Sequence, residues 1–209
     1  MGEQLGIVEI LGIAGSVSLL SGWRLYLTVL ATGLAMRFNV LPLPEHLAAL
    51  QILANPWVMG VAGTAAFMEF FADKVLWLDS IWDTVHTVIR PVGGALLALA
   101  VIDPSDPATQ AIAFILGGGA SLLAHGGKAS ARAVVNTSPE PFSNVAVSLA
   151  EDVATTGLLY LAYSNPVAAG MVALVLLVLA VGLLIMAWRV LRRIVLRVQG
   201  GPPPAGKAG

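Results

Sequence analysis

Residues 166–188 form an apolar run without a single charged side chain. A membrane-spanning helix needs roughly 20 mostly apolar residues, because a residue rises about 1.5 Å and the hydrocarbon core is about 30 Å thick. The rest of the chain has the same character: of its 209 residues, 57% are hydrophobic and 11% are charged. A soluble domain is about 25% charged. The sequence therefore predicts an integral membrane protein.

Similar apolar segments recur along the chain, so we predict an all-α membrane protein with six transmembrane helices. The first segment is long for one crossing and contains SGWR at 21–24, so we expect it to be tilted, kinked or entered by a short interfacial piece. Breaks are also expected at PVGG, 91–94, and GGG, 117–119, because proline removes a backbone donor and glycine loosens a helix. The predicted spans are 5–36, 56–74, 79–102, 107–136, 144–163 and 166–188.

The segments outside these spans complete the predicted organisation. Residues 41–56, LPLPEHLAALQILANP, predict a short amphipathic helix at the membrane interface. Residues 1–197 are expected to form one transmembrane domain, and residues 198–209 a disordered tail. Four arginines follow the last span, which favours a cytoplasmic C-terminus and, with six spans, a cytoplasmic N-terminus. Arg37, after the first span, counts against this orientation.

The third predicted span carries a polar stripe on an otherwise apolar helix. Asp79, Asp83, His86 and Arg90 follow one another at intervals of four, three and four residues. At about 100° per residue they fall within about 60° of arc. Ile81, Trp82, Val85, Val88 and Ile89 are expected to cover the rest of this helix.

Three other spans carry comparable polar groups, and the pattern suggests a repeat of two helical hairpins. Asn144, Ser148, Glu151 and Thr155 repeat the intervals of the third span. Charges in a bilayer cost several kcal/mol each, so these groups must face one another or water. The candidate residues for binding a substrate or ion are Arg24, Glu69, Asp73, Lys74, Asp79, Asp83, His86, Arg90, His125, Lys128, Arg132, Asn136, Glu140, Asn144, Ser148, Glu151 and Asp152.

Three functions are compatible with such a polar centre. The first is a transporter or channel for a small ion or polar solute, with a cavity that the charged residues line. Histidines beside carboxylates suit proton coupling in such a cavity. The second is a structural or assembly protein held together by a buried ion-pair network. The third, a lipid-modifying enzyme, is disfavoured because the sequence lacks HExxH and GxSxG motifs, and we assign no catalytic residue.

Cofactors and partners are weakly constrained. No cofactor is expected, although Asp79, Asp83 and His86 are candidate ligands for a divalent metal. The chain has no cysteine and a net charge of −1, which argues against thiolate metal sites and nucleic-acid binding. The lipid bilayer is one expected partner. Small residues at 63–66 and 117–121 are compatible with a homodimer.

Three long motifs resemble a family of bacterial membrane proteins known as a domain of unknown function (DUF 4126). They are SGWRLYLTVLATGLAMRF, EFFADKVLWLDSIWDTVHTVIRPVGGALL and HGGKASARAVVNTSPEPFSNVAVSLAEDV, and the resemblance covers about residues 15–180. It implies a compact helical protein of the bacterial inner membrane and transfers no activity. Leu76 departs from the pattern, since a proline is expected there.

Overall fold

A computed structural model describes residues 6–40, 45–102, 106–135 and 141–199, all of its elements being helical. Five of the helices (α1, α3, α4, α5 and α6) are long and apolar enough to cross a membrane, whereas α2 has 17 residues. The predicted class, an all-α membrane protein, is therefore confirmed. The elements are α1 (Ile7–Arg37), the 3₁₀-helix η1 (Glu45–Ala54), α2 (Pro56–Ala72), α3 (Leu76–Val101), α4 (Pro107–Val135), α5 (Pro141–Ser164) and α6 (Pro166–Gln199).

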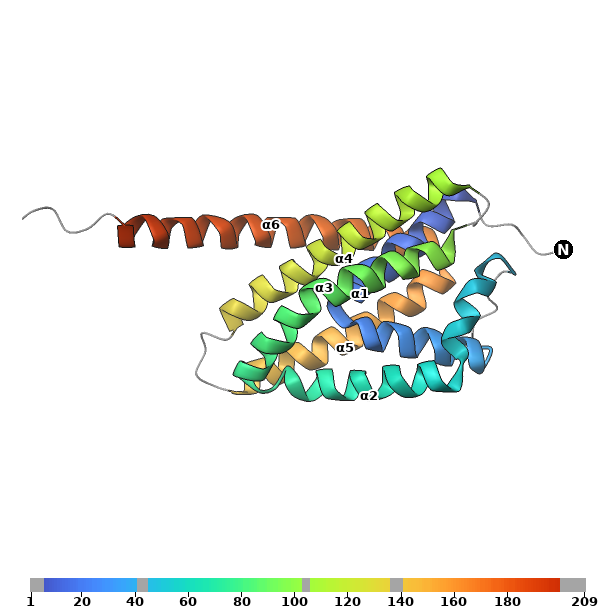
Figure 1. The fold of residues 1–209 in the computed structure, drawn as a ribbon, viewed down its shortest axis with the longest axis horizontal. Helices are drawn as coiled ribbons and strands as arrows, with labels where there is room; N and C mark the ends of the chain where they lie inside the picture. Colours follow the sequence, from blue (N-terminus) through green and yellow to red (C-terminus); the bar gives the residue numbers. More distant parts are fainter. Residues whose placement is uncertain (1–5, 41–44, 103–105, 136–140, 200–209) are drawn as a thin grey trace, which may run out of the picture.

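The long first helix turns back on itself at Arg24. This residue has φ −143° and ψ 71°, outside the helical region. Gly12, on the first leg, packs against the backbone of Pro166, and Gly33, on the second leg, packs against the backbone of Leu53. Pro166 begins α6, and Leu53 lies in η1, directly before α2. These elements meet at the same end of the bundle, and Figure 1 shows both legs of α1 leading to that end. The kink expected near 21–24 is confirmed at Arg24, and it makes the first segment a re-entrant helix pair and not one tilted crossing.

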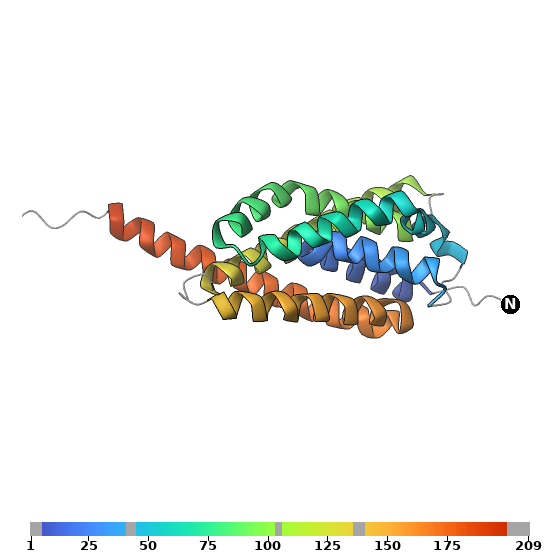
Figure 2. The same cartoon turned by 90° about the horizontal axis from the view of Figure 1, so that it is seen from below.

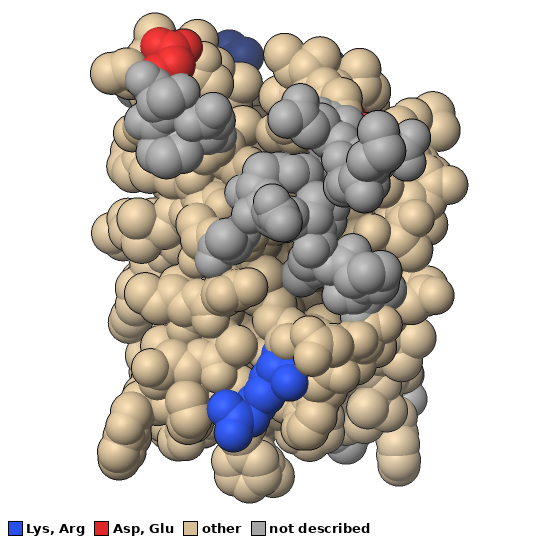
Figure 3. Space-filling model, turned by 90° about the vertical axis from the view of Figure 1, so that its right-hand side faces the viewer, with Lys and Arg blue, Asp and Glu red and all other residues tan. Residues whose placement is uncertain are grey.

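This path separates the start of α1 from the end of α6. The first leg of α1 begins and the second leg ends at one end of the bundle, and α6 leaves the bundle at the other end (Figure 1). The placement of both termini on the cytoplasmic side stays a prediction. Few charged side chains are visible among the described residues at the end of the bundle where α1 begins (Figure 3).

The legs of α1 form the centre of the bundle. Figure 2 shows them between α2 and α3 on one side and α5 and α6 on the other. A Cβ at Gly22 would come within 2.2 Å of the Ser121 carbonyl oxygen, and a Cβ at Gly117 within 2.5 Å of the Ala98 Cβ. Small residues therefore let α1, α3 and α4 approach at backbone distance.

The predicted breaks at PVGG and GGG are wrong. Pro91 lies inside the continuous helix α3, and residues 117–119 lie inside the continuous helix α4. A Cβ at Gly94 would come within 2.5 Å of the Ser121 Cβ, so these small residues serve close helix packing. Gly117 and Ser121 are buried inside the chain and are not free for a dimer contact, and a dimer remains a prediction.

Two other segments differ from their predicted form. Residues 45–54 are a 3₁₀-helix, and its Leu47 and Leu50 belong to the hydrophobic core, so this segment packs against the bundle. Residues 198 and 199 continue α6, and the rest of the predicted tail lies outside the described residues. The starts predicted at 56, 107 and 166 are confirmed, since α2, α4 and α6 each begin with that proline, a residue favoured in the first turn. α5 also begins with a proline, Pro141, three residues before its predicted start.

Candidate functional site

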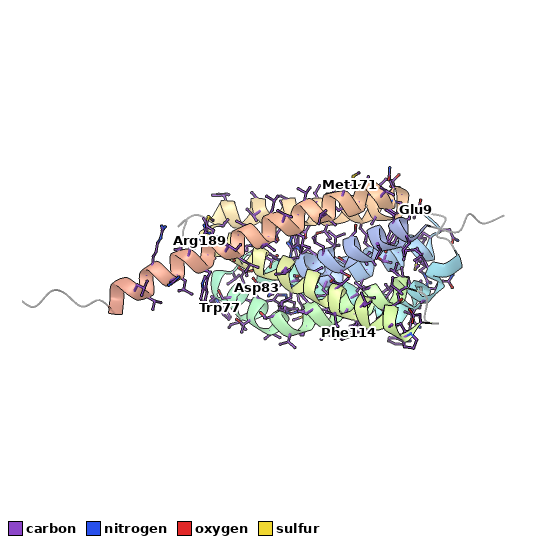
Figure 4. All side chains as sticks on the ribbon, turned by 90° about the horizontal axis from the view of Figure 1, so that it is seen from above. Glu9, Trp77, Asp83, Phe114, Met171 and Arg189 are labelled. Carbon is purple, nitrogen blue, oxygen red and sulfur yellow. The ribbon has the colours of Figure 1, made fainter. Side chains whose placement is uncertain are left out.

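The re-entrant turn of α1 reaches a group of buried charges contributed by α2, α3, α4 and α5. We call it the central cluster. Four cations and five carboxylates form ion pairs in it among the described residues. Figure 4 places Asp83 toward the end from which α6 projects, and Glu9 at the opposite end. Its members are Arg24, Glu69, Asp73, Asp83, Arg90, Lys128, Arg132, Glu151 and Asp152, with His86 and His125 beside them.

Asp73, at the C-terminal end of α2, is the anionic centre of one half of the cluster. Its Oδ2 pairs with Arg24 and lies 3.3 Å from Arg132 Nη2 and 3.8 Å from Lys128 Nζ. The Asp73 carbonyl accepts a second hydrogen bond from Arg132 Nη1 at 3.1 Å. A helix C-terminus carries partial negative charge, which adds to the attraction for these cations.

Glu151, on α5, shares the same three cations. Its Oε2 lies 2.8 Å from Arg132 Nη2, 3.4 Å from Arg24 Nη2 and 3.5 Å from Lys128 Nζ. The neighbouring Asp152 adds an Oδ1 that lies 2.9 Å from Arg24 Nε. The three cations therefore bridge α2 and α5, two helices joined by no other ion pair in the described part of the chain.

Arg90, on α3, organises the other half of the cluster. Its Nη2 lies 2.6 Å from Glu69 Oε1, and its Nη1 lies 3.3 Å from Asp83 Oδ1. Both carboxylates depend on this one guanidinium, so the Arg90 group carries one more carboxylate than cation. The second oxygen of Glu69 is buried without a hydrogen-bond partner.

The hydrogen bonds of the two histidines differ, and those of His125 require a neutral ring. Arg90 Nη1 lies 2.7 Å from His125 Nδ1, and a guanidinium only donates, so Nδ1 accepts and the ring proton lies on Nε2. That Nε2 is 3.1 Å from the carbonyl oxygen of Asp83. His86 donates from Nδ1 to the Trp82 carbonyl at 2.7 Å, and its Nε2 lies 2.9 Å from the Tyr26 hydroxyl.

The turn of α1 supplies backbone acceptors as well as Arg24. The carbonyl of Gly22 accepts from Arg90 Nη1 at 3.3 Å, and the carbonyl of Trp23 accepts from Lys128 Nζ at 3.1 Å. A helix that stops at Arg24 leaves carbonyls of its last turn without helical donors. Two cations of the cluster donate hydrogen bonds to two of these carbonyls, so the irregular backbone at Arg24 is stable inside the bundle.

Each half of the cluster combines a deep carboxylate with one nearer the surface. The side chains of Glu69 and Asp73 are 1% and 0% exposed, and both come from α2. The side chains of Asp83 and Glu151 are 12% and 16% exposed, and they come from α3 and α5. We call the first two the deep carboxylates and the second two the rim carboxylates. In the Arg90 half, Glu69 and Asp83 share Arg90. In the other half, Asp73 and Glu151 share Arg24, Lys128 and Arg132.

Most of the sequence-predicted site residues meet in this cluster. On α3 the predicted stripe is confirmed, since Asp79, Asp83, His86 and Arg90 are buried while Val88 is 70% exposed. Ser148 accepts hydrogen bonds from Arg24 through its carbonyl and its hydroxyl. Lys74 lies at the α2–α3 turn, where its Nζ donates to the Phe70 carbonyl and sits 2.9 Å from the centre of the Phe70 ring. Asn136, Glu140 and the side chain of Asn144 lie outside the described residues.

The metal site expected from Asp79, Asp83 and His86 is not formed. Among the described residues no group of three His, Asp or Glu side chains is arranged to hold a metal ion. The reason is that Asp83 faces Arg90, and His86 is held by Tyr26 and by the Trp82 ring, which stacks on it at 4.4 Å.

Sequence reasoning missed three residues at the site. Tyr26 has no pattern that distinguishes it from a lipid-facing tyrosine, and Trp82 was assigned to the apolar face although it stands one turn before His86. Ser121 was assigned to a small-residue face, yet its Oγ donates to the Arg90 carbonyl at 2.8 Å and lies 3.2 Å from Ser21 Oγ. Its position one turn before His125, on the stripe of α4, was the available signal.

An apolar groove of about 730 Å³ adjoins the cluster between the second leg of α1, η1, α2 and α3. Its walls include Leu25, Val29, Val61 and Leu97. Tyr26 stands between the two environments, because it lines the groove and its hydroxyl bonds His86. The groove is suited to hydrocarbon, not to a polar solute, so the polar chemistry is confined to the cluster.

These features define a class: a multi-pass helical membrane protein with a buried ion-pair cluster at a re-entrant turn. Residues 11–186 match the family described as Domain of unknown function (DUF4126). The chain therefore belongs to that family, as its three long motifs suggested. The comparison with curated proteins and the comparison with solved structures gave no match.

Proposed function

We propose that this protein is a transporter or channel for a small ion or polar solute, with its binding site in the central cluster. The observation that carries the proposal is the re-entrant turn of α1, which brings irregular backbone and Arg24 to buried charges. In membrane proteins such backbone is tolerated inside protein or along a water-filled cavity, and it recurs at substrate and ion sites. Ionisable residues at this depth are most often functional.

The rim carboxylates are the proposed exchangeable groups. Arg90 neutralises one of its two carboxylates, so a proton or small cation bound at Asp83 would balance the charge of this half. Glu151 competes with Asp73 for the same three cations, so its release would leave a cationic site open to an anion or a polar solute. The more exposed member of each half is the one that can change partners, and the deep carboxylates hold the cations in place.

The alternative function is structural, and one observation favours it. Each of the four cluster cations lies within 4 Å of at least one carboxylate. A fully paired network could simply hold α1 to α2, α3, α4 and α5. The two functions differ in whether ions cross the membrane and in whether removing a rim carboxylate changes that flux.

Asp83→Asn is expected to reduce ion flux at least tenfold while leaving the protein folded, because Arg90 keeps its 2.6 Å pair with Glu69. The flux is measured in proteoliposomes that contain dyes sensitive to protons, sodium or potassium, under an imposed gradient of the corresponding ion. Asp106→Asn is the control, since Asp106 is an exposed carboxylate at the start of α4. Thermal unfolding in detergent is measured for both variants.

Two results would count against cation transport. One is a wild-type protein that carries none of the three ions; the other is a folded Asp83→Asn protein with unchanged flux. If the wild type is silent and Asp83→Asn mainly lowers the melting temperature, the structural function is supported. Should Asp83→Asn fail to fold, Asp83→Glu keeps the charge while moving the carboxylate, and its flux then decides between the two.

A further inference from the structure

The last third of α6 continues beyond the bundle as a single helix. α6 has 34 residues, which corresponds to about 51 Å at 1.5 Å per residue, against about 30 Å for the hydrocarbon core. Figures 1 and 2 show its C-terminal part projecting without neighbours, and Figure 4 places Arg189 where the helix leaves the bundle. We call residues 188–196 the α6 extension.

The extension has one apolar face and one cationic face. At about 100° per residue, Val190, Leu191, Ile194 and Val195 fall within about 140° of arc. These four side chains are 42–54% exposed. The opposite face carries Arg189, Arg192 and Arg193, all exposed.

The apolar face of the extension has no cover within the described chain. An exposed apolar stripe on a helix is unfavourable in water, so a surface outside this chain must receive it. The charge of the helix limits the choice: residues 166–199 contain no Asp or Glu. A second copy of α6 would bring further arginines and no carboxylate to pair with them, so self-association along this helix is disfavoured.

We propose that the α6 extension docks on the anionic surface of the membrane that α6 spans. A helix with arginines on one face and branched apolar residues on the other suits the boundary between headgroups and acyl chains. Arginines that directly follow a transmembrane helix attract anionic headgroups. Trp188, 66% exposed, marks the start of the extension with a residue that prefers the interface. Docking requires the extension to approach the membrane plane, by tilting of α6 or by a bend near Arg189.

The test uses the full chain and exploits its lack of cysteine. Ile194→Cys places a fluorescent label on the apolar face, and Leu196→Cys places one among the arginines as a matched control. The labelled protein is reconstituted in vesicles of phosphatidylcholine, alone or mixed with phosphatidylglycerol. Quenching by brominated lipid tails and by aqueous iodide is then compared. We expect lipid quenching at position 194 in the anionic vesicles and iodide quenching at position 196.

The arginines are tested by Arg189→Gln/Arg192→Gln/Arg193→Gln in the Ile194→Cys background. Each juxtamembrane arginine raises the partitioning of the extension onto an anionic membrane surface roughly fivefold. The triple variant should therefore lower this partitioning by on the order of a hundredfold. High salt should weaken quenching of the parent protein, because it screens the headgroup charge. Equal iodide access at both positions in anionic vesicles would overturn the proposal, as would full lipid quenching in the triple variant. Protection from both quenchers would instead point to a protein partner. These outcomes do not depend on transport.

Discussion

Replacing Arg90 with methionine is expected to lower the free energy of unfolding by about 3–5 kcal/mol, the usual consequence of leaving a buried charge without its partner. Arg90 is 0% exposed, and no other cation is paired with Glu69 or Asp83 in the described chain. Methionine matches much of the volume, so the loss reports the missing charge and hydrogen bonds. Unfolding is followed by denaturant titration in mixed micelles.

A compensating substitution separates the charge from the packing. In Arg90→Met/Glu69→Gln the deep carboxylate is gone, so a good part of the lost stability should return, whereas Glu69→Gln alone retains Arg90 paired with Asp83. Arg189→Met, on the exposed extension of α6, serves as the control and should change stability by less than about 0.5 kcal/mol. A stable Arg90→Met protein, or a double variant no better than the single one, would contradict this account of the cluster.

Gly22→Ala is the second large effect we expect, with a loss of about 1–3 kcal/mol or more from overpacking. The new Cβ would lie 2.2 Å from the Ser121 carbonyl oxygen and 2.8 Å from the Ala124 Cβ. Backbone atoms of α4 cannot move away without displacing Ser121 from the Arg90 carbonyl. The substitution therefore also disturbs the turn of α1 that carries Arg24 into the cluster.

Gly15→Ala is the matched control on the same helix. Nothing lies within 4 Å of a Cβ built at Gly15, and alanine is the better helix former by about 1 kcal/mol. Thermal unfolding of the two variants in the same detergent is the measurement. If Gly22→Ala unfolds at the same temperature as Gly15→Ala, the close approach of α1 to α4 is not what stabilises the turn.

The two halves of the cluster give the proposed function a physical basis. Cations shared between a deep and a rim carboxylate hold α1, α2, α3, α4 and α5 together, yet each half has one partner that can be replaced. Arg90→Met breaks the ion pair with the deep carboxylate Glu69, whereas Asp83→Asn changes only a rim carboxylate. A large stability loss in the Arg90 variant and a flux loss in the Asp83 variant would show that the deep pair stabilises the fold and that the rim carboxylate serves transport.

Local patterns in the sequence predicted the helices and the polar stripes because these depend on near neighbours. The four-three-four spacing of Asp79, Asp83, His86 and Arg90 puts them on one face whatever the tertiary fold. Prolines at 56, 107, 141 and 166 mark helix starts for a reason internal to the residue, since the first turn needs no proline N–H. The candidate site residues were therefore found largely from spacing.

The path of α1 could not be found in this way. Its 31 residues are apolar enough for one tilted crossing, and nothing in the spacing distinguishes a crossing from a turn. PVGG and GGG carried stronger local signals for a break than Arg24 did. Pro91 stays helical in α3, and the glycines of α4 are used for close packing.

By itself, then, the sequence determined an all-helical membrane protein, its polar faces and most residues of the cluster, because hydrophobic length and helical period are local properties. Only the tertiary structure decided that the kink expected near 21–24 is a full turn at Arg24, and which acids lie deep and which lie at the rim. Those features depend on contacts between distant segments: Gly12 on Pro166, Gly33 on Leu53, and Arg24 with Asp73. The turn is stable because distant helices supply the charges and donors that a break at Arg24 requires.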